Sequence, residues 1–230
     1  MSHWTKDERS ADPILARLDA LRGAQSTLPS LTELEATLYR EGEATVLAFP
    51  AGTCLVLPAA APRPWAITEG FAFDPPVSFG EAMAISDGME LSHVSVESWP
   101  ADSGEVIRAY TRFFTGSGRE AFESWRDDWI GPILEDPEDY GYDATALALN
   151  DPADFMAVYD DSNGTFGGFH RQTEGPSGEP AFVLWMHDEP MGFFARSLQH
   201  AATLTYGDYL VASLLAHATD GDSYELLFPG

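Results

Sequence analysis

Three apolar runs with turn residues between them lie in residues 154–187, and they constrain the fold most. The first two runs, 154–160 and 165–171, flank Asn163-Gly164, and Asn-Gly is the strongest short-range signal for a β-hairpin. A polar loop separates them from the third run, residues 181–187. Short apolar runs separated by turns are typical of neighbouring antiparallel strands. This part of the chain therefore predicts a three-stranded antiparallel sheet.

Further strands are predicted in the first hundred residues. Two apolar runs, 44–49 and 53–57, flank Pro50-Ala51-Gly52, which is typical of a hairpin turn. Residues 90–97 alternate between apolar and polar side chains and predict one more strand.

Helices are predicted where apolar residues recur at helical spacing. Asp12-Pro13 resembles a helix start with Asp12 as the N-cap, and Gly23 would end that helix. Ser30 and Glu33 have capping-box spacing, so a second helix is expected from there to Gly42. The other expected helices cover residues 105–114, 117–131, 197–204 and 205–218. We predict an α+β fold with helices flanking a mostly antiparallel sheet. Residues 1–11 would be a flexible polar arm, and residues 12–230 a single domain with 12–100 as a candidate N-terminal subdomain.

The charge of the chain excludes several kinds of partner. The sequence has 37 Asp and Glu residues against 12 Lys and Arg, a formal net charge of −25. Phosphate groups would repel such a chain, so direct binding to nucleic acid or to an anionic membrane surface is not expected. A strongly basic protein partner, or a high-salt environment, would suit this charge.

Cysteine content and hydropathy bear on where the protein works. Cys54 is the single cysteine and lies in an apolar run, so we expect a buried side chain and no internal disulfide. The first ten residues lack the apolar stretch of a secretory signal, and no window has the roughly 20 apolar residues of a membrane helix. The expected location is the cytoplasm.

The order of the predicted elements resembles that of the SUKH superfamily. In that family a strand near an acidic Gly turn is followed by a second strand, a loop, a third strand that ends near His-Asp/Glu, and a C-terminal helix. Here these pieces are residues 155–164, 166–171, 180–189 and 209–213, and residues 14–23 with Leu28-Pro29 resemble the family's opening helix and its Leu-Pro step.

The resemblance implies a non-enzymatic binding protein. Many bacterial members of the family resemble immunity proteins that neutralise toxins, often nucleases, whose basic surfaces an acidic inhibitor can occlude. Tyrosine among carboxylates suits an interface that faces arginine. The expected partner-binding residues are Glu135, Asp136, Glu138, Asp139, Tyr140, Tyr142, Asp143, Tyr159, Asp160 and Asp161. The expected partner is a basic, nuclease-type protein toxin, and no cofactor or metal is expected.

Two alternatives stay open. His170 and His187 lie on neighbouring predicted strands and could pair across the sheet, so that they and Glu189 would form the site of a hydrolase or metal-dependent enzyme. No motif of established catalytic spacing supports this reading. In the second alternative the acidity is an adaptation to a salty cell and marks no partner.

Overall fold

The fold is described from a computed structural model. It describes residues 4–60, 73, 76–92, 110–113, 135, 154–160, 166–185 and 203–228. The chain forms two compact units, both discontinuous in sequence. The first unit comprises Met1–Pro62, Val77–Phe113 and Tyr206–Gly230, and the second comprises Arg63–Pro76 and Phe114–Thr205. The predicted α+β class is confirmed.

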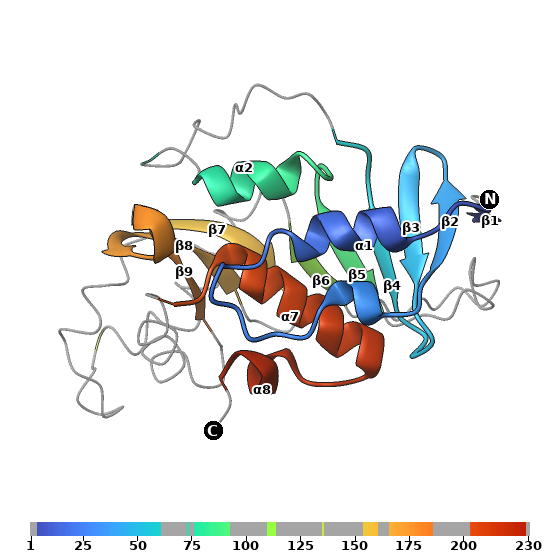
Figure 1. The fold of residues 1–230 in the computed structure, drawn as a ribbon. Helices are drawn as coiled ribbons and strands as arrows, with labels where there is room; N and C mark the ends of the chain where they lie inside the picture. Colours follow the sequence, from blue (N-terminus) through green and yellow to red (C-terminus); the bar gives the residue numbers. More distant parts are fainter. Residues whose placement is uncertain are drawn as a thin grey trace. The chain divides into compact units, whose positions relative to one another are not determined.

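The first unit contains an antiparallel meander of six strands (Figure 1). In chain order these are β1 (Thr5–Lys6), β2 (Thr37–Glu41), β3 (Ala44–Ala48), β4 (Cys54–Leu57), β5 (Met89–Ser92) and β6 (Tyr110–Phe113). The predicted hairpin around Pro50-Ala51-Gly52 is confirmed, because β3 pairs with β4 and Gly52 takes a φ of +78°. The β2–β3 turn likewise contains a glycine in the left-handed region, Gly42 at +60°.

One face of this sheet carries the core of the unit. The strand registers align Leu38, Leu47, Leu55 and Leu91 in one row across four strands, and all four side chains are buried. The described helices of the unit are α1 (Asp12–Asp19), α2 (Val77–Met83), α7 (Tyr206–Thr219) and α8 (Ser223–Leu227), with the 3-10 turn η1 (Leu31–Glu33). In Figure 1, α1 and α7 lie in front of these strands.

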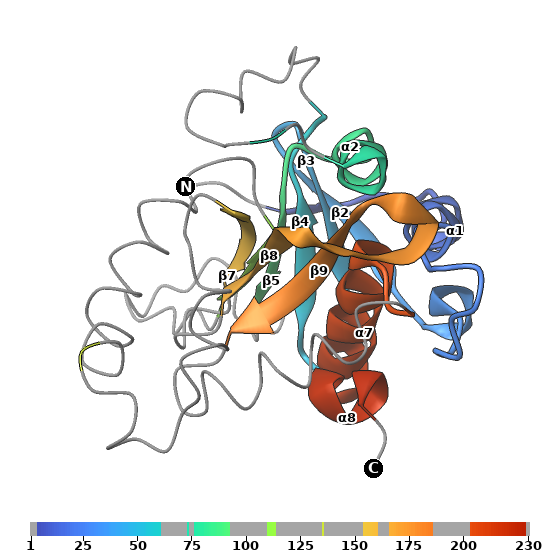
Figure 2. The same ribbon diagram turned by 90° about the vertical axis from the view of Figure 1, so that its left-hand side faces the viewer.

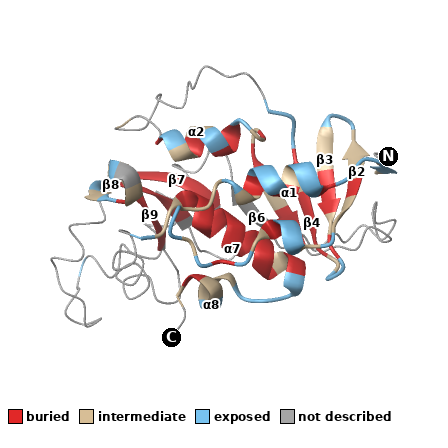
Figure 3. Cartoon of the chain, in the orientation of Figure 1, coloured by how far each residue is buried: buried red, intermediate tan, exposed pale blue. Residues whose placement is uncertain are grey.

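Helix α7 is the central helix of the first unit. It contacts α1, η1, α2 and α8. Its residues are buried on every side from Tyr206 to Ala216, which makes it the long red helix of Figure 3. A helix that is apolar all round belongs in an interior. The helix predicted over residues 205–218 is therefore confirmed.

Residues 30–42 do not form the predicted helix. Ser30 does cap a helical turn, since its Oγ accepts from the backbone N–H of Thr32 at 3.3 Å, but the turn ends at Glu33. The chain then enters β2, where Leu38 is buried and its neighbours are half-exposed. The spacing of the leucines fits a helix, but Thr37 and Tyr39 favour a strand, and the ladder with β3 provides their backbone partners.

The ends of two other predicted elements also differ. The predicted N-cap of the first helix is wrong by one residue, because Ala11 is the N-cap and Asp12 is the first helical residue of α1. The helix ends at Asp19, four residues before the predicted end at Gly23. Residues 110–113 form β6 and not the end of the helix predicted over residues 105–114. Pairing with β5 supplies the backbone partners of this Tyr-Thr-Arg-Phe segment, which is rich in strand-forming residues.

The expected flexible arm is partly ordered. Thr5 and Lys6 pair with β2 as strand β1, and Ala11 is buried. The first unit also includes the C-terminal helices, so it does not coincide with the candidate subdomain 12–100.

The described part of the second unit is a three-stranded antiparallel sheet. It contains β7 (Phe155–Asp160), β8 (Phe166–Glu174) and β9 (Pro180–Trp185), with the 3-10 turn η7 (Pro176–Gly178) between the last two strands. The three predicted strands are thus confirmed within one to three residues at their ends. The turn at Asn163-Gly164, the helix predicted over 117–131 and residues 197–202 of the helix predicted over 197–204 lie outside the described residues, and Thr203 and Leu204 are not helical.

Gly168 allows β7 and β8 to lie close together. A Cβ atom at this position would lie 2.2 Å from the carbonyl oxygen of Met156 and 2.8 Å from the ring of Phe155. Only glycine fits a strand position where another backbone comes this near. The pairing of β7 with β8 shifts register between Ala157 and Tyr159, which pair with Gly168 and Gly167. A shift of this kind bends the strand locally.

Candidate functional site

Two residues of the predicted partner-binding surface have described side chains. Glu135 is exposed in a helical conformation, as a partner-binding carboxylate requires. Tyr159 is only 6% exposed within β7, so the prediction that its ring faces a partner is wrong. The alternation of β7 could not reveal this, because both faces of the strand are buried. Asp160 ends β7, and its side chain lies outside the described residues, as do Asp136, Glu138, Asp139, Tyr140, Tyr142, Asp143 and Asp161.

The predicted cross-strand pairing of His170 with His187 is wrong in its register. His170 lies on β8 with Phe155 opposite on β7 and Ala181 opposite on β9. Its side chain is 1% exposed, and Nδ1 lies 2.7 Å from the hydroxyl oxygen of Thr173. These are the surroundings of an interior histidine with a hydrogen bond. His187 and Glu189 lie outside the described residues.

Two buried titratable side chains of the first unit, Cys54 and Tyr206, are poorly suited to act in catalysis at neutral pH. Burial raises the pKa of the Cys54 thiol to about 12, so the nucleophilic thiolate does not form near neutral pH. Burial also raises the pKa of the Tyr206 phenol, whose ring packs edge-on against Phe79 at 5.6 Å. Among the described residues, no group of three His, Cys, Asp or Glu side chains is arranged to hold a metal ion.

The exposed charge of the first unit is mostly negative. Three exposed basic side chains, Lys6, Arg9 and Arg17, are outnumbered by nine exposed acidic ones in its described part. The nine are Glu8, Asp12, Glu33, Glu35, Glu43, Glu81, Asp220, Asp222 and Glu225. These positions are spread along the chain, in turns, loops and helices. The sequence analysis missed them because it looked for acids close together in sequence.

The arginines of the first unit are largely engaged by two aspartates. Within the described residues, the ion pairs of Arg9, Arg22 and Arg40 all end on Asp7 or Asp19. Arg9 and Arg40 both donate to the Asp7 carboxylate, at 2.5 and 3.2 Å, and Arg40 also donates to the Thr45 hydroxyl at 2.9 Å. The hydrogen bonds from Arg9, followed by the one from Arg40, hold the pKa of Asp7 well below its usual value. The nine exposed acids take no part in these ion pairs.

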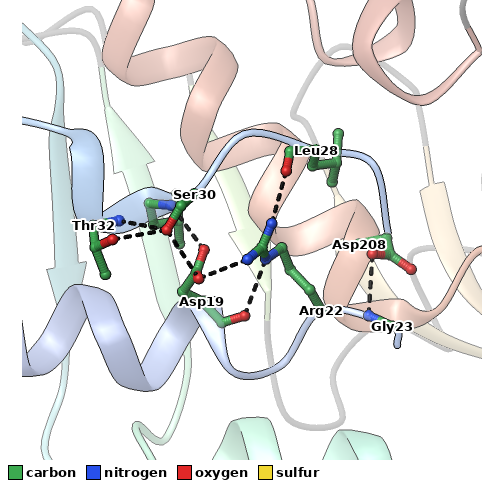
Figure 4. A network of polar contacts seen from close by, with 8 residues as sticks. Asp19, Arg22, Gly23, Leu28, Ser30, Thr32 and Asp208 are labelled. Carbon is green, nitrogen blue, oxygen red and sulfur yellow. Dashed lines mark hydrogen bonds and ion pairs between the residues drawn. The ribbon is translucent and has the colours of Figure 1, made fainter. Parts of the chain in front are cut away.

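A second polar network fastens the segment between α1 and η1 (Figure 4). The Asp19 carboxylate accepts from Arg22 at 2.8 Å, from the Ser30 hydroxyl at 3.1 Å and from the Leu31 backbone N–H at 2.8 Å. Arg22 also donates to the Leu28 carbonyl oxygen at 2.7 Å. These contacts fix a polar loop on the surface, and they account for Asp19 and Arg22 without any ligand.

The same loop is fastened to α7. The buried Asp208 carboxylate in the first turn of α7 accepts from the backbone N–H of Gly23 at 3.1 Å (Figure 4). Gly207 lies directly against the backbone of Leu21, where a Cβ atom would come within 1.7 Å of the carbonyl oxygen. The start of α7 therefore depends on close contact with a segment almost two hundred residues away in sequence.

Comparison with known proteins gives no relative. No family model, no curated protein and no solved structure matches the chain. In the described part of the chain, none of the helices combines the length and the apolar character needed to cross a bilayer.

Proposed function

We propose that the chain is a non-enzymatic binding protein, an immunity protein that occludes a basic, nuclease-type toxin. The observation that carries the proposal is the excess of exposed carboxylates, nine against three exposed basic groups in the described part of the first unit. A surface with this balance attracts a cationic partner from a distance and speeds its association.

Two further observations support a binding role. Within the described residues of the first unit, the ion pairs of Arg9, Arg22 and Arg40 end on Asp7 and Asp19, so the nine exposed acids take no part in them. Two titratable groups of the described interior, Cys54 and His170, have the surroundings of core residues. In the proposal, Glu135 and its acidic neighbours in sequence, residues 136–143, meet the partner, while Tyr159 does not.

The first test is capture of a partner by the tagged chain at low salt. We expect a basic protein to bind, to elute at high salt, and to lose its nuclease activity when the chain is added back. A captured protein that keeps its full activity in the complex would contradict occlusion.

The second test separates a local interface from a general effect of charge. One variant neutralises Glu135, Asp136, Glu138, Asp139 and Asp143 as the corresponding amides. The matched control removes the same number of charges from the first unit, at Glu33, Glu35, Glu43, Glu81 and Glu225. We expect the first variant to dissociate much faster from the toxin than the control, because lost contacts raise the dissociation rate and lost charge alone lowers the association rate. Equal dissociation rates would overturn the placement of the interface.

A further inference from the structure

The N-terminal residues form a thin cover over the outer edge of β2. We call Trp4–Arg9 the strap. Its strand β1 pairs only with Tyr39 and Arg40, and next to it the Asp7 backbone N–H donates to the Leu38 carbonyl oxygen at 2.9 Å. On its other side, β2 pairs with β3 along all five of its residues.

Side-chain contacts of Trp4 and Asp7 supplement the short ladder of the strap. Both residues of β1 are exposed, so they bury little apolar surface. Trp4 donates from Nε1 to the Glu41 carboxylate at 2.7 Å and lies beside Tyr39, with ring centroids 6.2 Å apart. Asp7 accepts from Arg40 at 3.2 Å. These contacts are part-buried, and the ladder they support is only two residues long, so we expect the strap to open more readily than the longer ladders of the described sheet.

The covered edge is suited to pairing with a copy of itself. The Leu38 carbonyl points to the strap, and by alternation the backbone groups of Arg40 do the same. An antiparallel pair of β2 strands centred on Tyr39 would set Leu38 opposite Arg40 and Thr37 opposite Glu41 of the other copy, so that no like charges are opposed. An open edge with this sequence is a template for strand addition.

We propose that the strap keeps the chain from dimerising through β2, and that its release allows the β2 strands of two copies to pair antiparallel about Tyr39. The net charge of −25 on each copy opposes this pairing, so dimerisation should increase with salt, which screens the repulsion. Binding to a basic partner should weaken with salt. Because the two processes depend on salt in opposite directions, the dimerisation proposal and the proposed function can be tested separately.

The test uses the full chain with the strap contacts removed, Trp4→Ala with Asp7→Asn. Light scattering at increasing protein and salt concentration measures the mass, and circular dichroism confirms that the fold is kept. We expect the mass to double at high salt in this variant and to stay unchanged in Glu8→Ala, an exposed strap residue used as the control. If the double variant unfolds, Asp7→Asn alone serves. A folded variant that stays monomeric at every salt concentration would overturn the proposal.

Two cysteine variants test the register of the pair. With the strap contacts removed, Tyr39→Cys places two thiols opposite each other about the two-fold axis, and mild oxidation should give a disulfide-linked dimer. With Trp4 and Asp7 unchanged, Lys6→Cys together with Tyr39→Cys should form a disulfide within one chain and leave it monomeric even at high salt, because these residues are paired neighbours. The native Cys54 is buried and does not compete. A dimer that forms without the 39–39 crosslink would overturn the proposed register.

Discussion

At the scale of single residues, two glycines in helices make a matched pair of tests. Gly207→Ala would place a methyl group against the Leu21 backbone, which cannot relieve the clash by changing rotamer as a side chain can. We expect a loss of about 1–3 kcal/mol in the free energy of unfolding. Gly80→Ala in α2 meets nothing within 4 Å and should gain about 0.5–1 kcal/mol from better helix propensity. Urea denaturation of both variants gives the comparison, and a mild effect at Gly207 would contradict the close contact.

Asp7 gives a prediction about pH. Its pKa in the folded chain is lowered from 3.8 by the bonds from Arg9 and Arg40, so the charged form is favoured by folding. The resulting stability is present above pH 3.8 and is lost as the pH falls through the lowered pKa. Asp7→Asn should therefore be less stable than the parent at pH 7, and the difference should shrink in strong acid. Denaturation of dilute protein at a series of pH values checks this, and a constant difference would contradict it.

At the scale of elements, the Asp19 network should control local opening between α1 and η1. Asp19→Ala removes the acceptor for Arg22, Ser30 and the Leu31 N–H. We expect a loss of about 1–3 kcal/mol and faster hydrogen exchange at the Leu31 amide. Gln25→Ala, an exposed change in the same loop, is the control and should leave that exchange rate unchanged.

Some strands could be predicted from the sequence alone, and others could not. The hairpins at residues 44–57 and 155–174 could be predicted because glycine turns separate apolar runs. Strand β2 is not predicted, because Leu31, Leu34 and Leu38 fit a helix locally, and this spacing outweighs the strand preference of Thr37 and Tyr39 unless the ladder with β3 is known. The burial of Tyr159 could not be predicted because both faces of β7 are buried, and the need for glycine at position 207 depends on contact with the distant Leu21, which no local pattern contains.

At the scale of the whole molecule, salt separates the proposed function from adaptation to high salt. A salt-adapted protein unfolds at low ionic strength, because unscreened repulsion among its carboxylates destabilises it. For a binding protein with a net charge of −25, we expect a cooperative melting transition even at low salt, with a midpoint that rises modestly as NaCl is added. Thermal melts monitored by circular dichroism provide the measurement. A chain unfolded in dilute buffer would favour salt adaptation.

The position of α7 in the sequence sets the order in which the protein can mature on the ribosome. All residues of the second unit precede residue 206, whereas the first unit cannot complete its fold until its central helix, α7, has been translated. At about 5–20 residues per second, the interval between translating Phe113 and the end of α7 is on the order of 10 s. During that time the first unit lacks the helix that contacts α1, η1, α2 and α8. Nascent chains of this protein should therefore recruit chaperones through the N-terminal sheet, and be most open to proteases, just before α7 emerges.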